Sequence, residues 1–269
     1  MAEILRYDHV YIRYGRSLAV KDISFSLDEG EILGIVGESG SGKSSLIRAA
    51  MGLLGNSGVV AEGDILYRGK SLVSLDEAEM RSLNGVELGM IFQNTGSFFC
   101  PVRRVKDQLY ESAAEHGHVG KEEFNNRLEE LFLRLGLENV HRILESYPFE
   151  LSGGMLQRVG IASAMLLYPG VIFADEPTSD LDASVQKQVI EEMLSLRDSF
   201  KTSIVLVTHN IKAAAAMSDR ILVMKSGETV EYGKTEQVLA YPKKEFTKRL
   251  IESELNRSEE RRVGKECRS

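Results

Sequence analysis

The segment from Gly37 to Ser44, with the sequence GESGSGKS, combines the residue types that hold phosphate groups. Glycines let backbone N–H groups approach phosphate oxygens, Lys43 places a cation near the β- and γ-phosphates, and the Ser44 hydroxyl suits Mg²⁺. The apolar run 31–36 predicts a strand before this loop, and residues 43–54 have helical periodicity after it. Because strand, glycine loop and helix follow in this order, a chance glycine turn is a poor explanation.

Two adjacent carboxylates, Asp175 and Glu176, end the apolar run 171–174. Neighbouring residues of a strand point in different directions, so each carboxylate can have its own role. Asp175 suits Mg²⁺, held through water, and Glu176 suits orienting or deprotonating an attacking water molecule. An acidic turn at the end of a core strand would explain the pair equally well in a chain that had no phosphate-binding loop.

His209 and Gln93 also follow apolar runs, at residues 203–207 and 90–92. The carboxyl ends of parallel strands form the edge at which such sheets bind ligands. We therefore expect His209 to contact a γ-phosphate and Gln93 to lie at the same edge, next to a helical segment. The alternatives are a structural histidine and an ordinary polar loop residue.

A second glycine element, Leu151 to Met155 with the sequence LSGGM, precedes a stretch of helical character from Leu156 to Tyr168. A helix N-terminus presents N–H groups and the positive end of the helix dipole to an anion, and Ser152 adds a hydroxyl. One chain thus carries two separate elements suited to phosphate. This pairing indicates an ATP-driven machine in which a second element closes onto the nucleotide.

The surrounding elements predict an α/β fold. Residues 4–14 and 21–36, broken at Gly15 and at residues 28–30, read as strands that begin an antiparallel sheet. Charged amphipathic helices, such as residues 122–135, occupy about residues 94–148 and indicate an inserted helical lobe. The apolar runs 171–174 and 203–207 predict buried parallel strands, followed by two short strands around Ser226-Gly227 and a closing helix over 246–255.

Composition bounds the function. The 269-residue chain has a net charge of −7, which argues against a broad nucleic-acid interface. Cys100 and Cys267 lack the number and spacing of a disulfide framework or a CxxC metal site, so a reducing cytoplasm is the default. The chain shows no signal peptide and no apolar run of membrane-spanning length, so a membrane partner would have to do the spanning.

The order of these motifs, together with Ser179-Asp180-Leu181-Asp182 after Glu176, resembles the ATP-binding cassette (ABC) ATPases over about residues 3–255. The resemblance implies a P-loop NTPase core with a RecA-like parallel sheet, an N-terminal antiparallel β-subdomain and an inserted α-helical subdomain. It also implies that two cassettes pair head to tail, so that the LSGG of one completes the P-loop site of the other. Tyr14 matches the aromatic that stacks on adenine in this family, with plain packing as the alternative.

The expected site residues follow from the motifs and the resemblance. ATP and Mg²⁺ are the expected cofactors, Ser44, Gln93 and Asp175 the expected Mg²⁺ ligands, and Glu176, His209 and Gln93 the expected catalytic group. The expected nucleotide contacts are Tyr14, Gly37, Glu38, Ser39, Gly40, Ser41, Gly42, Lys43, Ser44, Ser45, Ser152, Gly153 and Gly154.

Softer signals are similar to the peptide/nickel importer branch of the family: the segment 147–155, YPFELSGGM, and the stretch from Tyr241-Pro242 to Ile251. This branch implies a peripheral ATPase on the cytoplasmic face of the membrane, two permease subunits, an extracytoplasmic solute-binding protein and uptake of oligopeptides, nickel or a metal chelate. Asp180, where the family generally has a small residue, points to a second cassette that is not a copy of this one. Leu156 and Phe99-Cys100-Pro101 also depart from the family pattern.

The resemblance divides the chain into an ABC ATPase domain at 1–235, with the helical subdomain at about 94–150, and a C-terminal helical extension at 236–255. Residues 256–269 bury little, and either a disordered tail or a sequence-assembly scar explains them. His116-Gly117-His118 is a weak metal candidate.

Three other functions compete with an importer. A cassette that acts on nucleic acid or ribosomes is disfavoured by the acidic charge and by the presence of one cassette without a coiled-coil insertion. A GTPase is disfavoured because no NKxD element occurs, and an inert cassette because Glu176 and His209 are both present.

Overall fold

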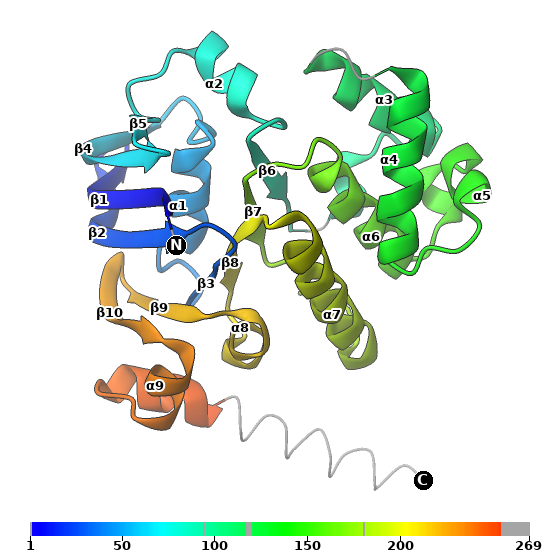
Figure 1. Ribbon diagram of the computed structural model, residues 1–269. Coiled ribbons are helices and arrows are strands. Elements are labelled where there is room, and N and C mark those ends of the chain that lie inside the picture. Colours follow the sequence, from blue (N-terminus) through cyan, green and yellow to red (C-terminus); the bar gives the residue numbers. More distant parts are fainter. Residues whose placement is uncertain (1, 94, 117–119, 180, 254–269) are drawn as a thin grey trace, which may run out of the picture.

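A computed structural model describes residues 2–93, 95–116, 120–179 and 181–253, whose strands form two sheets. Figure 1 shows the smaller sheet on one side of the molecule and a group of helices on the other, with the larger sheet between them. The antiparallel sheet, the central sheet and the helical lobe are the three parts of the expected fold, and the predicted fold class is confirmed.

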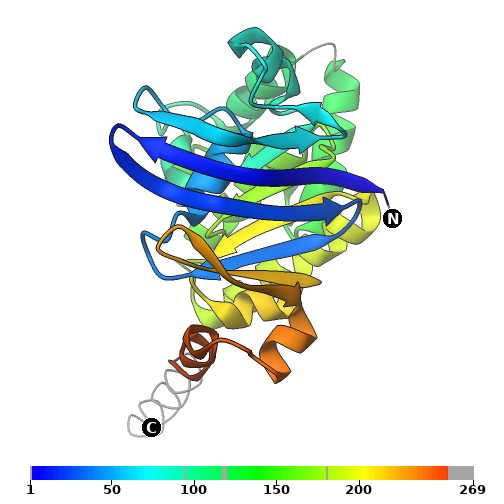
Figure 2. The same cartoon turned by 90° about the vertical axis from the view of Figure 1, so that its left-hand side faces the viewer.

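The smaller sheet has the strand order β2-β1-β4-β5, and its pairs are antiparallel. Figure 2 shows the long hairpin of β1 and β2 crossing this side of the molecule. Buried side chains recur along β1 and β2, as in a sheet that covers a core with one face. The strands run over Glu3–Tyr14 (β1), Ser17–Asp28 (β2), Gly58–Tyr67 (β4) and Lys70–Ser71 (β5).

The central sheet has the order β10-β9-β3-β8-β7-β6, and its five strands from β9 to β6 are parallel. The edge strand β10 pairs with β9 in the antiparallel direction, through the predicted turn at Ser226-Gly227. Every residue of β3, β7 and β8 is buried, which explains their continuous apolar runs. The strands are Ile32–Gly37 (β3), Leu88–Ile91 (β6), Val171–Asp175 (β7), Ser203–Thr208 (β8), Arg220–Lys225 (β9) and Glu228–Lys234 (β10).

Helices lie on both faces of this sheet. One core cluster joins the antiparallel sheet and α1 to one face, where Leu33 and Ile35 point. A second cluster joins α6, α7 and the helical lobe to the other face, where Ile32 points. The α-helices are Lys43–Ala50 (α1), Glu77–Leu83 (α2), Val105–Glu115 (α3), Lys121–Arg134 (α4), Val140–Glu145 (α5), Gly153–Met165 (α6), Ala183–Phe200 (α7), Ile211–Met217 (α8) and Thr235–Ala240 (α9); Thr95–Phe98 (η1) and Pro148–Glu150 (η2) are 3₁₀ turns.

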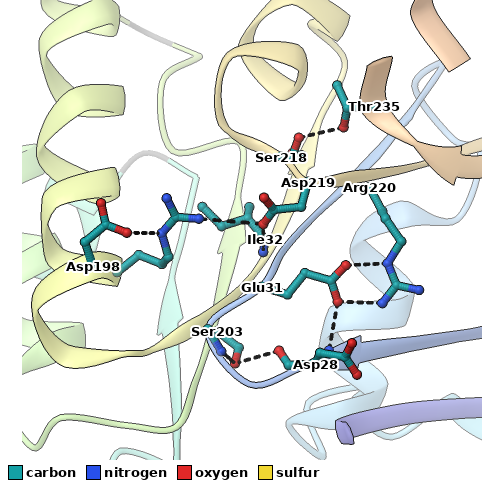
Figure 3. A network of polar contacts seen from close by, with 11 residues as sticks. Asp28, Glu31, Ile32, Asp198, Ser203, Ser218, Asp219, Arg220 and Thr235 are labelled. Atoms are coloured by element: carbon teal, nitrogen blue, oxygen red, sulfur yellow. Dashed lines mark hydrogen bonds and ion pairs between the residues drawn. The ribbon is translucent and has the colours of Figure 1, made fainter. Parts of the chain in front are cut away.

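A polar network closes the amino edge of the central sheet, where β3, β8 and β9 begin (Figure 3). Arg220 forms a two-point ion pair with Glu31, and Asp219 Oδ2 accepts the backbone N–H of Ile32 at 2.8 Å. Ser203 Oγ accepts the N–H of Gly30 at 2.9 Å. These contacts fix the start of β3, the strand that leads into the glycine loop.

Several boundaries differ from those expected. Strand β2 begins at Ser17 instead of residue 21, and neither β4 nor α2 was predicted from the sequence. The closing helix begins at residue 245 and is described to residue 253, while Cys267 and the tail 256–269 lie outside the described residues.

Candidate functional site

Four neighbouring parallel strands deliver the expected site residues to one edge of the central sheet. In the ladders Val36 is opposite Thr208, Val207 is opposite Asp175, and Ala174 is opposite Ile91. Because the strands end level with one another, the residues that follow them meet at this edge. In sheet order, β3 leads to Gly37 and the loop, β8 to His209, β7 to Glu176 and β6 to Gln93.

The loop between β3 and α1 is folded around the Lys43 ammonium group. Lys43 Nζ donates to the carbonyl oxygens of Gly37 and Glu38, at 2.8 Å each, and its side chain is buried. Burial lowers the pKa of Lys43, while the carboxylates of Glu176, Asp175 and Glu38 act in the opposite direction. The expected contacts from Glu38 to Gly40 remain exposed, as a surface for phosphate oxygens requires.

The same loop is held from outside by the turn between β9 and β10. The N–H of Gly227 donates to the Ser41 carbonyl at 3.1 Å. A side chain at Gly42 would lie 2.6 Å from the Ala19 carbonyl oxygen, and φ there is +96°, so only glycine fits. The Ser41 hydroxyl is buried and has no hydrogen-bond partner among the described residues. The backbone is therefore fixed while a hydroxyl stays free for a ligand.

Ser44 and Asp175 face one another across the start of α1 and the end of β7. Ser44 Oγ donates to Asp175 Oδ1 at 2.9 Å. Asp175 is buried, and this burial raises its pKa although the Ser44 hydroxyl and the positive charge of Arg48 favour the ionised form. A hydroxyl and a carboxylate placed together supply the oxygen ligands that Mg²⁺ prefers. The structure thus brings together two of the three expected Mg²⁺ ligands.

Glu176 points away from this pair and toward His209. Its Oε2 atom lies 3.0 Å from His209 Nδ1, and its N–H donates to the Val207 carbonyl at 2.8 Å. Glu176 has φ of +47°, a backbone strain that is commonest at functional sites. The His209 side chain is half-exposed, whereas only 19% of the Glu176 side chain is exposed. The two adjacent carboxylates therefore have different partners, as the sequence predicts.

The LSGG element begins helix α6. Ser152 caps the helix by accepting the N–H of Met155 at 3.3 Å, and Gly153 and Gly154 form its first turn. The helix therefore starts three residues before the expected Leu156. The N–H groups of Gly153 and Gly154 belong to its first turn, where backbone donors have no acceptor within the helix. Ser152 and Gly153 are exposed, and Figure 1 shows α6 beside the helical lobe, on the other side of the central sheet from α1.

The structure gives fewer contacts for the remaining expected site residues. Tyr14 is half-buried, and its hydroxyl lies 3.3 Å from the Oγ atom of Ser45, another expected contact. Gln93 is exposed, two residues beyond β6. Asp180 and His118 lie outside the described residues, and those that are described contain no cluster of metal-binding side chains.

A groove of about 740 Å³ between the central sheet and the helical lobe was missed by the sequence reasoning. Phe98 and Phe99 line it, and Phe98 is 58% exposed. The ion pairs Arg81–Glu115 and Arg103–Glu111 border it. The aromatic pair within residues 95–101 was the available signal. Phe92, the neighbour of Gln93 in sequence, also lines the groove, so the groove lies next to the end of β6.

Beside this groove, η1 and α6 approach closely. A Cβ atom on Gly160 would lie 1.8 Å from Thr95 Cγ2, and one on Gly96 would lie 2.8 Å from Leu156 Cδ2. Leu156, noted above as a departure from the family pattern, thus fills space against a glycine. The segment after Gln93 and the LSGG helix are fitted to one another.

Comparison with known proteins identifies the family. The family model for ABC transporters matches residues 20–179. The chain is 39% identical over 240 residues to the oligopeptide transport ATP-binding protein OppD of Bacillus subtilis, covering 89% of this chain and 67% of that protein. It is 37% identical over 232 residues to the metal-staphylopine import system ATP-binding protein CntD of Staphylococcus aureus, covering 86% and 85%.

Solved structures agree with this assignment. The ATP-binding cassette MJ0796, solved as a dimer in a post-hydrolysis state with ADP and Pi, matches with a TM-score of 0.75 and 27% identity, covering 86% of this chain and 99% of that one. CbiO1 of Clostridium perfringens shares the fold with a TM-score of 0.79 and 24% identity, covering 90% and 92%. In the part of the chain that the structure describes, no helix combines the length and apolar character needed to cross a membrane. The chain belongs to the ABC transporter family and is an ATP-hydrolysing cassette of the kind that energises importers.

Proposed function

We propose that this cassette binds MgATP at the edge formed by β3, β8, β7 and β6 and hydrolyses it to drive uptake through partner permeases. One observation carries the proposal: four consecutive parallel strands bring Lys43, His209, the Asp175-Glu176 pair and Gln93 to a single edge. The expected division into an ATPase domain with an inserted helical subdomain and a C-terminal extension belongs to this proposal.

Within this site, the chain's own groups have distinct tasks. Lys43 and the loop N–H groups bind phosphate, and Glu176 orients a water molecule and accepts its proton. His209, held by Glu176, stabilises the γ-phosphate. Mg²⁺, when bound, would neutralise phosphate charge; Ser44 and Asp175 would hold it, and Gln93 is proposed as a further ligand. The 2.9 Å contact between the Ser44 hydroxyl and the Asp175 carboxylate supports that assignment.

The exposed LSGG helix supports a second cassette as a partner. Ser152 and Gly153 present an uncovered helix N-terminus, although α6 lies on the other side of the central sheet from α1. An anion site that does not face the chain's own phosphate loop can complete a site on another chain. We propose a head-to-tail pair in which Ser152 to Gly154 contact the partner's ATP, while Tyr14 and Ser45 contact ATP in their own chain. The second cassette is proposed to be non-identical, on the basis of Asp180.

The groove beside η1 supports the proposal that permease subunits are partners of this cassette. It has an apolar floor and charged rims, and the exposed ring of Phe98, with the half-buried ring of Phe99 beside it, offers an anchor for an amphipathic helix. Because η1 begins two residues after Gln93, a helix seated there would contact the segment that leads to the proposed nucleotide edge. Two permease subunits would place the cassette on the cytoplasmic face of the membrane.

The cargo follows from the relatives. The relatives named above are an oligopeptide transport ATP-binding protein and a metal-staphylopine import system ATP-binding protein. We propose a peptide, nickel or a metal chelate, delivered by an extracytoplasmic solute-binding protein. Nucleic acid is not proposed as a partner.

Reconstitution tests the proposal. The cassette would be co-expressed with two candidate permeases and a candidate second cassette from the same genome, and the complex placed in proteoliposomes with the solute-binding protein. ATP-dependent accumulation of labelled oligopeptide, nickel or metal chelate is the expected result, abolished in a matched complex with Glu176→Gln. Failure of the cassette to co-purify with those permeases would contradict the partner assignment.

A further inference from the structure

Gln157, on the buried side of the LSGG helix, is bonded to the backbone beside Glu176. Its Nε2 atom donates to the Pro177 carbonyl oxygen at 2.7 Å, and only 8% of the residue is exposed. Pro177 directly follows Glu176, so this hydrogen bond connects α6 to the peptide unit next to the proposed catalytic carboxylate. Position 157 lies outside the set of residues that the motifs single out.

The loop that follows Glu176 is held from a second side by α7. Gln186 Nε2 donates to the carbonyl oxygens of Thr178, at 2.8 Å, and Leu181, at 3.0 Å. Ser179 Oγ donates to the Glu176 carbonyl at 3.1 Å. Two glutamine amides therefore secure this loop, and the one from Gln157 comes from the helix that carries Ser152 to Gly154.

A cavity of about 190 Å³ lies where these elements meet. This pocket interrupts side-chain packing between the elements, so fewer direct contacts join them there than in a filled core. Directional hydrogen bonds at the wall then have a larger part in setting the relative position of the elements. The lining residues come from η1 (Thr95, Gly96), from α6 (Gly153, Gln157) and from the loop (Glu176, Ser179), among others.

We propose that Gln157 is a positioning residue that makes hydrolysis at Glu176 depend on the placement of α6 in the same chain. The inference rests on the proposed function, in which the N-terminus of α6 contacts nucleotide held by a second cassette. A shift of α6 toward that nucleotide would move the Pro177 carbonyl through the Gln157 amide and so re-aim Glu176. The nucleotide that α6 contacts would thereby control hydrolysis in the chain's own loop.

The hydrogen bond from Gln157 can be removed by a substitution that keeps the size of the side chain. Gln157→Met keeps the length and apolar stem but leaves the buried Pro177 carbonyl without this donor. Thr202→Val is the matched control, because Thr202 Oγ1 donates to the Pro169 carbonyl at 3.0 Å and is also buried, at the amino edge of the sheet. Both variants remove one side-chain donor from a buried proline carbonyl, so a general loss of stability affects both.

The assembled complex would be assayed for ATPase activity with each variant in turn. Gln157→Met is expected to lower kcat about tenfold relative to Thr202→Val, with KM for ATP within about twofold of wild type. Equal kcat in the two variants would overturn the proposal, and so would a raised KM with unchanged kcat, which would mean that Gln157 only supports nucleotide binding. If wild-type complex hydrolyses ATP without driving uptake while this split persists, the importer proposal fails and the positioning role stands.

Gln157→Glu gives a second readout, which does not need Gln157→Met to fold. A protonated carboxyl can donate to the Pro177 carbonyl, whereas a carboxylate cannot. Burial favours the protonated form, so kcat relative to wild type at the same pH should rise as pH falls from about 8 to about 6. A ratio that stays constant over this range would overturn the proposal.

Discussion

The Nδ1 atom of His209 lies 3.0 Å from the Oε2 atom of Glu176, joining the ends of two neighbouring strands, β8 and β7. Asp175, one residue earlier, turns the other way and accepts the Ser44 hydroxyl. Two carboxylates adjacent in sequence thus serve different neighbours: Asp175 is the last residue of β7, whereas Glu176 comes after the strand and has a φ of +47°. This arrangement separates a group suited to acting on water from a group suited to holding a cation.

Glu176→Gln should lower turnover by on the order of 10² to 10⁴ while ATP binding is retained, because an amide cannot accept the proton of water. The measurement is steady-state ATPase activity of the assembled complex, with equilibrium ATP binding measured in parallel. Glu191→Gln, an exposed change on α7, is the control and should leave both values near wild type. Near-normal turnover in Glu176→Gln would remove Glu176 from the mechanism.

Asp175→Asn should raise Tm of the nucleotide-free chain at pH 8 by a few degrees, since each kcal/mol is worth about 2–4 °C at this size. Burial raises the pKa of Asp175. The folded chain therefore binds this proton more readily than the unfolded chain, and stability falls as pH rises through the folded-state pKa. The asparagine lacks this cost, so the gain should shrink as pH is lowered toward about 4.

Calorimetry of the wild type and the asparagine variant across that pH range measures the effect. The variant should also gain less stability than the wild type when MgATP is added, because one proposed cation ligand is lost. A lower Tm for Asp175→Asn at pH 8 would show that the carboxylate is stabilising, contrary to the direction of its pKa.

Lys43→Met should weaken ATP binding roughly 10- to 100-fold, the factor expected when a charge-assisted hydrogen bond is lost. The ammonium already contacts two loop carbonyls, so the variant also loses contacts that shape the loop. Titration calorimetry gives Kd directly. Lys21→Met removes a half-buried lysine paired with Glu228 and should not change Kd. Equal affinity in the two variants would contradict the placement of phosphate beside Lys43.

Gly160→Ala should destabilise the chain by about 1–3 kcal/mol, because its new methyl group would collide with Thr95 Cγ2. Thr95→Ser removes that carbon, so the double variant should be more stable than the sum of the single changes predicts, by about 0.5–3 kcal/mol. Urea unfolding measures all four corners of the cycle. Gly233→Ala, where a methyl group would make an ordinary 3.4 Å contact, is the control. Additive effects on the free energy of unfolding would mean that α6 and η1 separate to admit the methyl group with no loss of stability.

The sequence predicts well which residues meet at one edge of the central sheet, because two simple regularities act together. Runs such as 171–174 and 203–207 are buried on both faces and read as parallel strands, and such strands end at a shared edge. The placement of Lys43, Ser44, Asp175, Glu176 and His209 follows directly. Gln93 reached the expected edge as well, yet the structure leaves its side chain exposed and its role a prediction.

Other features depend on long-range packing that no local pattern reports. Strand β4 has an irregular burial pattern, with buried residues only at Ile65 and Tyr67, and Gly63 interrupts it by fitting against the His9 carbonyl, so its sequence lacks a strand signature. Thr95 can lie this close to residue 160 only because Gly160 has no side chain. The early start of α6 depends on the Ser152 cap. A serine followed by two glycines does not by itself predict a helix N-cap.

Helix α7 runs between the two ends of the strands of the central sheet. Asp182 caps its first turn beside the loop that follows Glu176, and 18 residues, about 27 Å, separate the ends of the helix. Near its far end Arg197 lies 3.6 Å from Asp219, whose carboxylate also holds the Ile32 N–H at the start of β3 (Figure 3). Helix α7 therefore runs from the loop after Glu176 to the edge where β3 begins, with a polar contact at each end.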